Sequence, residues 1–166
     1  MMPVLTSETP HTQWRGDGRT MVVTFDFGFR DRAGIWHWSF RGDIIDGASI
    51  PKYGWSIVGS PYVGNHRVPA AIHDSDYVYR RNSRKVCDRG FLDSLKFCGA
   101  SWEKRHFFYR MVRDFGAKPY NSNHHDDFAI DELPKEIMNV PQGSLVPPMW
   151  HHEWKRAIKE WVIAEV

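Results

Sequence analysis

One stretch of the chain, VPAAIHDSDYVYRRNSRKVCDRGFLDSLKF, concentrates the side chains best suited to chemistry. It places a histidine beside an aspartate, follows them with two tyrosines, and puts another aspartate at the start of the next apolar stripe. Residues three and four apart share one face of a helix. This spacing predicts a common face for His73, Asp76, Tyr77 and Arg80, with Asp74 one step around the helix.

Asp88 precedes Phe91, Leu92, Leu95 and Cys98 at helical spacing, so we expect its carboxylate to point inward. An unpaired buried carboxylate is costly, so Asp88 needs a partner. His73 on the neighbouring helix would provide one: Asp88 would accept a hydrogen bond from one ring nitrogen and leave the other to take a proton from water. This is the base-plus-orienter arrangement of hydrolases. The alternative interpretation is a structural polar network.

Further oxygen atoms surround this pair in the sequence. Asp74 would hold a cation that polarises a carbonyl, and backbone carbonyls of the preceding glycine-rich loop would complete the shell of a hard ion such as Ca²⁺. Tyr77 and Tyr79 would donate their hydroxyls to the carboxylates. The remaining histidines, including the HHDD run at 124–127, form no recognisable ligand pattern.

The elements that must position these residues predict an α+β fold. Residues 1–19 form an extended arm, and residues 20–40 a β-hairpin with a turn at DRAG and Trp36, Trp38 and Phe40 on one face. Residues 41–116 combine a loop rich in glycine and proline with a three-helix core. Its helices run from about Pro69 to Arg81, from the cap Ser83 to Gly99, and from the cap Ser101 to Gly116.

Beyond the core, we expect an irregular segment at 117–148 and an amphipathic helix at 149–164. Trp150, Trp154, Ile158 and Trp161 share one stripe of that helix, which would pack on its own domain or lie on a membrane surface. With 166 residues, the chain is expected to form one domain, 1–166.

The composition narrows the partners and the compartment. A net charge of +2 does not indicate nucleic-acid binding. The N-terminus has neither the basic start nor the apolar run of a signal peptide, and no run of eighteen apolar residues occurs. We expect the host cytoplasm or a virion as its location. Cys87 and Cys98, eleven apart on one predicted helix, would lie about 16 Å apart, too far for a disulfide.

Residues 41–116 resemble a domain of unknown function common in tailed phages and prophages. The shared pattern is an Asp-x-x-Ser-x-Pro segment (DGASIP), then His-Asp-x-x-Tyr (HDSDY), then an Asp-headed helix and a basic, aromatic helix that ends in glycine. The resemblance implies a phage or prophage origin. Asp46 and Ser49, in the first segment, would supply a metal ligand to the same site, or Asp46 would simply cap the turn at Ser49.

The HDSDY motif followed by CDRGFLDSLKF also resembles the helical core of phospholipase A2 enzymes. That resemblance implies His73 as general base, Asp74 as calcium ligand, Tyr77 as supporting hydroxyl and Asp88 as the residue that orients His73. The implied reaction is attack of an activated water on a phospholipid ester, with Ca²⁺ as cofactor.

Two further functions stay open on the sequence. One is a non-enzymatic phage protein, such as a virion or tail accessory component or a binder of a host factor, suggested by the many tryptophans. The other is an esterase or amidase that uses the same dyad on cell-wall material during lysis. Lipid micelles and peptidoglycan fragments would tell the enzymatic alternatives apart.

Overall fold

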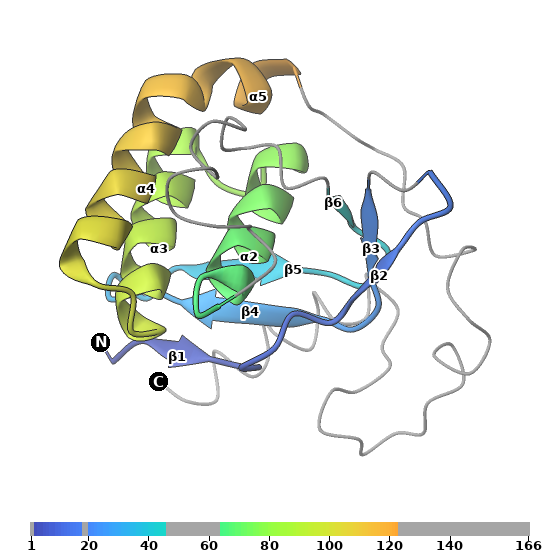
Figure 1. The fold of residues 1–166 in the computed structure, drawn as a ribbon, viewed down its shortest axis with the longest axis horizontal. Helices are drawn as coiled ribbons and strands as arrows, with labels where there is room; N and C mark the ends of the chain where they lie inside the picture. Colours follow the sequence, from blue (N-terminus) through green and yellow to red (C-terminus); the bar gives the residue numbers. More distant parts are fainter. Residues whose placement is uncertain (1, 18–19, 46–63, 123–166) are drawn as a thin grey trace.

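The computed structural model describes residues 2–17, 20–45 and 64–122 and confirms the α+β class. Two small antiparallel sheets come first, and helices follow (Figure 1). One sheet has the order β1-β4-β5, from Val4–Leu5, Phe27–Arg30 and Trp36–Ser39. The other has the order β2-β3-β6, from Thr12–Trp14, Met21–Val23 and Ile44–Ile45.

The predicted hairpin is present but shorter than expected. Strands β4 and β5 pair in register from Phe27↔Ser39 to Arg30↔Trp36, around the predicted DRAG turn. Residues 21–23 form β3, which belongs to the other sheet. The segment expected as an extended arm supplies β1 and β2, one strand to each sheet, because the edges of β4 and β3 accept its backbone hydrogen bonds.

Three helices form the predicted core: α2 at Arg67–Val78, α3 at Arg84–Phe97 and α4 at Trp102–Phe115. Ser83 and Ser101 occupy the predicted cap positions of α3 and α4. Ser101 Oγ accepts from the backbone N–H of Lys104, whereas the side chain of Ser83 makes no capping hydrogen bond. A short helix, α5 at Ala117–Ser122, occupies the first residues of the segment expected to be irregular. The predicted helix at 149–164 lies outside the described residues.

Helix α2 is the centre of the domain. It packs on α3 on one side and on β5 and β6 on the other, and the short 79–83 connection makes α2 and α3 antiparallel neighbours (Figure 1). One apolar cluster joins α2 to both sheets and includes Val23, Phe27, Phe29 and Ile72. A second joins α3 to α4 and includes Phe91, Leu95, Phe108 and Val112. Polar residues of α2 therefore face protein on nearly every side.

Two smaller predictions also hold. Trp36, Trp38 and Phe40 stack along one face of β5, with ring centroids 4.8 Å and 5.9 Å apart. Both cysteines are free thiols. No helix within the described ranges is long and apolar enough to cross a bilayer.

Candidate functional site

His73 and Asp88 meet between α2 and α3, as the helical spacing predicts. Nε2 of His73 lies 3.1 Å from Oδ1 of Asp88, and the Tyr77 hydroxyl donates to the same oxygen. Both residues of the pair are buried: His73 is 3% exposed and Asp88 is fully enclosed. Among the described residues, Nε2 is the only nitrogen of His73 that makes a hydrogen bond, so Asp88 fixes the ring through that atom.

Arg113 completes the shell around Asp88. Its guanidinium donates to Oδ2 of Asp88 at 2.6 Å, and its side chain keeps 32% of its surface exposed. Burial alone would raise the pKa of the Asp88 carboxyl, but the hydrogen bonds and charge of His73, Tyr77 and Arg113 outweigh burial and lower that pKa. Asp88 is therefore held as a carboxylate with both oxygens engaged.

Asp76 does not join this group, although helical spacing predicted a shared face. It turns toward the sheet, where Oδ2 lies 2.6 Å from Nδ1 of His37, and the Asn82 amide also donates to it. The other nitrogen of His37 lies 3.5 Å from Oδ2 of Asp31. The fold thus builds a second buried polar cluster, Asp31–His37–Asp76, between α2 and β5.

The two carboxylates of this second cluster control the charge of His37. Burial works to lower its pKa, whereas the hydrogen bond and charge of Asp76, together with Asp31, raise it, and the net result is a raised pKa. Because each ring nitrogen faces an aspartate oxygen, the doubly protonated imidazolium fits the cluster.

A third polar cluster lies at the start of β6. The guanidinium of Arg81 donates to Oδ1 of buried Asp43 at 2.6 Å and lies over the Tyr79 ring. The Tyr79 hydroxyl accepts from the backbone N–H of Ile44 at 2.8 Å, and its predicted donation to a carboxylate stays a prediction. Nearby Asp26 is buried, which raises its pKa to about 7.

The other predicted site residues are not brought to the His73 pair by the described contacts. Arg80 is exposed at the end of α2 with φ of +45°, and its guanidinium donates to the backbone oxygens of Tyr120 and Asn121. Asp74 is buried on α2 at 2% exposure. Asp46 and Ser49 lie outside the described residues.

The predicted calcium site includes Asp46 and the glycine-rich loop, which lie outside the described residues. Within the described ranges, no group of three or more histidine, cysteine or acidic side chains converges as a metal site. Asp88, which is not among the predicted calcium ligands, accepts from His73, Tyr77 and Arg113. The predicted calcium site, of which only Asp74 lies within the described ranges, therefore stays a prediction.

Sequence reasoning missed His37, Asp31 and Arg113. Strand alternation carried a signal for His37: if Trp36 and Trp38 share one face of β5, residue 37 points to the other, toward α2. Gly90 carried a second signal, since an isolated glycine within a helix often marks a close approach. A Cβ atom at position 90 would lie 2.2 Å from Nε2 of His37. For Arg113 the sequence held no such signal, because a single sequence does not distinguish it from the other arginines of α4.

Comparisons with known proteins find two similar proteins of Sinorhizobium fredii. An uncharacterized protein of Sinorhizobium fredii, y4jT, is 34% identical over 97 residues, which cover 57% of this chain and 28% of the relative. A second one, y4iH, is 29% identical over 103 residues, which cover 62% of this chain and 43% of the relative. The chain thus spans less than half the length of either relative. No solved structure matches it significantly.

The family match covers the elements that carry all three polar clusters. It spans residues 21–112, from the start of β3 to α4, and so includes His37, His73 and Asp88 but stops one residue before Arg113. On this match, the chain belongs to the protein family of unknown function DUF1353.

Proposed function

We propose that this chain is an ester hydrolase in which His73 is the general base and Asp88 orients it. The observation that carries the proposal is the hydrogen bond from His73 Nε2 to Asp88 Oδ1, with the Tyr77 hydroxyl on the same oxygen. A histidine bound through Nε2 to a carboxylate presents Nδ1 as its basic atom. The phospholipase A2 resemblance rests on the same residues and adds the substrate class, a phospholipid ester.

The roles of the side chains follow from their contacts. Asp88 accepts the Nε2–H of His73 and thereby fixes the tautomer, and it stabilises the imidazolium that forms when Nδ1 takes a proton from water. Tyr77 and Arg113 hold the carboxylate in place from α2 and α4. The resulting hydroxide attacks the ester carbonyl, and the imidazolium then returns the proton to the leaving alkoxide. We route no step through Ca²⁺; when bound, it would be held by Asp74 and would polarise the ester carbonyl.

A matched set of variants tests this assignment. Purified wild-type protein, His73→Ala and Asp88→Asn would be assayed on phospholipid micelles, on a short-chain ester and on peptidoglycan fragments. His106→Ala serves as the control, because this ring contacts Trp102 on α4, away from Asp88. We expect His73→Ala to lose about 10²-fold or more in rate, as removal of a general base does, while the control keeps full activity.

The same assay separates the alternatives. Full activity in His73→Ala would remove the dyad from the reaction. Turnover of peptidoglycan fragments but not of lipids would favour the esterase or amidase of lysis. The phage or prophage origin is part of the proposal and rests on the sequence pattern of residues 41–116.

A second candidate function is that of a non-enzymatic phage protein, and the burial of His73 and Asp88 favours it. His73 is 3% exposed, and Asp88 joins three helices through Tyr77 of α2 and Arg113 of α4. Such a network serves equally well to fix the packing of α2, α3 and α4 in a virion component. No turnover by wild-type protein, together with co-purification with virions that survives His73→Ala, would support this candidate.

A further inference from the structure

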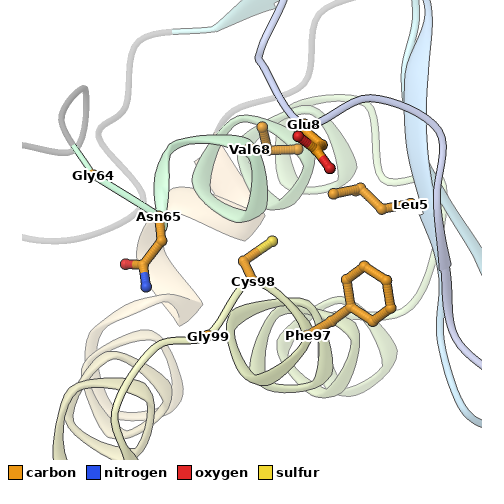
Figure 2. Close-up of a pocket in the computed structure, with 8 residues that line it drawn as sticks. All are labelled: Leu5, Glu8, Gly64, Asn65, Val68, Phe97, Cys98 and Gly99. Atoms are coloured by element: carbon orange, nitrogen blue, oxygen red, sulfur yellow. The ribbon is translucent and has the colours of Figure 1, made fainter.

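A pocket of about 380 Å³ lies apart from the three polar clusters, at the end of the α2–α3 pair. It is bounded by β1 and the residues after it, by the start of α2 and by the end of α3, and none of its lining residues contacts Asp88. Figure 2 shows side chains from all three segments around one space: Leu5, Glu8, Asn65, Val68, Phe97 and Cys98. Its size falls at the lower end of the range for small-molecule sites.

The walls of the pocket are mostly apolar. Leu5, Val68 and Phe97 come from three different segments, and Phe97 keeps 47% of its surface exposed. An aromatic ring this exposed beside a cavity offers its face to a ligand. At the opposite edge, Gly64 and Gly99 have φ of +91° and +78°, a conformation in which a larger residue would be strained.

The charged and polar groups around the pocket determine the sign of its electrostatic potential. Glu8 is the only charged side chain among the residues that line it, and it forms no ion pair with any described residue. The start of α2 and the end of α3 both border the pocket, so their opposite partial charges largely offset each other. Burial raises the pKa of the Cys98 thiol to about 11, and the charge of Glu8 adds to this effect. Cys98 therefore stays neutral, and Glu8 supplies the net charge.

These features exclude several classes of ligand. An anion would meet the Glu8 carboxylate and no lysine or arginine, because neither residue lines the pocket. A metal ion would find only one carboxylate and one neutral thiol in the pocket. Zinc and calcium sites in proteins use more ligands than these two. A cation with an apolar body fits both the charge and the walls, and its charge can also lie over the face of Phe97.

We propose that this pocket binds a small organic ammonium ion, with its apolar body against Leu5, Val68 and Phe97 and its charge at Glu8. This site is independent of His73 and adds a ligand class that the hydrolase proposal does not contain. Glu8 is exposed, so we expect weak binding that depends on salt concentration.

A pair of nearly isosteric probes tests the proposal on the full chain. Benzylammonium and benzyl alcohol differ in charge but little in shape, and each would be titrated while the backbone amides of Cys98 and Gly99 are followed by NMR. We expect saturable shifts with benzylammonium, and weaker binding of the alcohol. Glu8→Gln should weaken benzylammonium binding roughly twofold to fivefold, the range for an exposed ion pair.

Glu103→Gln is the matched control, because it removes the same charge from the exposed start of α4. It should leave the affinity unchanged. Equal affinity for the amine and the alcohol, tighter binding of benzoate, or the absence of any saturable shift would each overturn the proposal. None of these outcomes bears on the activity of His73.

Discussion

The imidazole of His37 lies directly against the backbone of Gly90 in α3. A methyl group at position 90 would lie 2.2 Å from Nε2 of His37, whose other nitrogen is held at 2.6 Å by Asp76. The ring is thus held between Gly90 and Asp76. Gly90→Ala should therefore lower the free energy of unfolding by about 1–3 kcal/mol, as overpacked core substitutions do. Urea unfolding of the two proteins measures the difference.

Helix propensity alone predicts the opposite effect of Gly90→Ala on the free energy of unfolding, so the measurement separates the two effects. Alanine ordinarily stabilises a helix interior over glycine by up to about 1 kcal/mol. Gly16→Ala, where a Cβ atom would meet nothing within 4 Å, is the control and should change the free energy of unfolding little. A Gly90→Ala protein as stable as wild type would contradict the close packing of His37 on α3.

The contribution of His37 to stability should fall as pH rises. Its pKa is raised in the folded protein above the ordinary value of 6.5, because Asp76 and Asp31 together outweigh burial. The stabilisation is therefore complete below about pH 6.5 and is lost as the pH passes through the higher folded pKa. The difference in unfolding free energy between wild type and His37→Gln, measured from about pH 6 to about pH 9, should shrink. A difference that grows with pH would refute the imidazolium assignment.

Asp26 should make the protein less stable when it ionises. Burial raises its pKa from 3.8 to about 7, so its contribution is fully present below pH 3.8 and is lost as the pH rises through about 7. Asp26→Asn keeps an oxygen for the backbone N–H of Arg41, which Oδ1 accepts in wild type. We expect the variant to gain stability relative to wild type as the pH rises, most clearly above about pH 7. Thermal unfolding across the pH range checks this, and an equal difference at every pH would contradict it.

Arg113 should matter to stability through Asp88. Arg113→Met removes the donor to Oδ2 and should cost about 1–3 kcal/mol, the range for a buried acceptor left unsatisfied. Arg113→Lys, which keeps a charge, should lose less, and Arg110→Met on the exposed side of α4 should have little effect. Chemical unfolding at neutral pH ranks the three variants, and a different order would argue against the pair.

The same pair predicts a shift in acid unfolding. The pKa of Asp88 is lowered in the folded protein, so its contribution is present above the ordinary value of 3.8 and is lost as the pH falls through the folded pKa. Without Arg113 that loss should occur at higher pH. The midpoint of acid unfolding in Arg113→Met should therefore move upward, whereas Arg110→Met should leave it in place.

The sequence predicted contacts between residues close in sequence better than contacts between residues far apart in sequence. His73 and Asp88 were predicted to meet because the period of 3.6 residues fixes which side of each helix faces inward, and two consecutive helices pack as neighbours. The caps Ser83 and Ser101 were found for a similar local reason. Asp76 escaped the same reasoning, because α2 is buried on several sides and helical period alone does not say which neighbour each side meets.

Helical periodicity does not predict contacts between residues far apart in sequence. His37 pairs with Asp76 across 39 positions in sequence, and the contact exists only because β5 packs on α2. The strands β1 and β2 are two and three residues long, too short for a periodic signal, and form because β4 and β3 offer open edges. Arg113 reaches Asp88 across 25 positions through a third helix.

Asp74 carries the last prediction, that it binds Ca²⁺ as the phospholipase A2 resemblance implies. Calorimetric titration of Ca²⁺ and then Zn²⁺ into wild type should show saturable calcium binding that Asp74→Asn loses, because Ca²⁺ depends on charged oxygen ligands. Bound Ca²⁺ should also raise the unfolding temperature of wild type alone, since a ligand specific to the folded state stabilises it by about 2.7 kcal/mol at a hundred times its Kd. Asp114→Asn, an exposed aspartate of α4, is the matched control. If neither ion binds wild type, the His73–Asp88 pair lacks the electrophile that the resemblance assigns to it, and a structural network in a non-enzymatic protein becomes the better account of these residues.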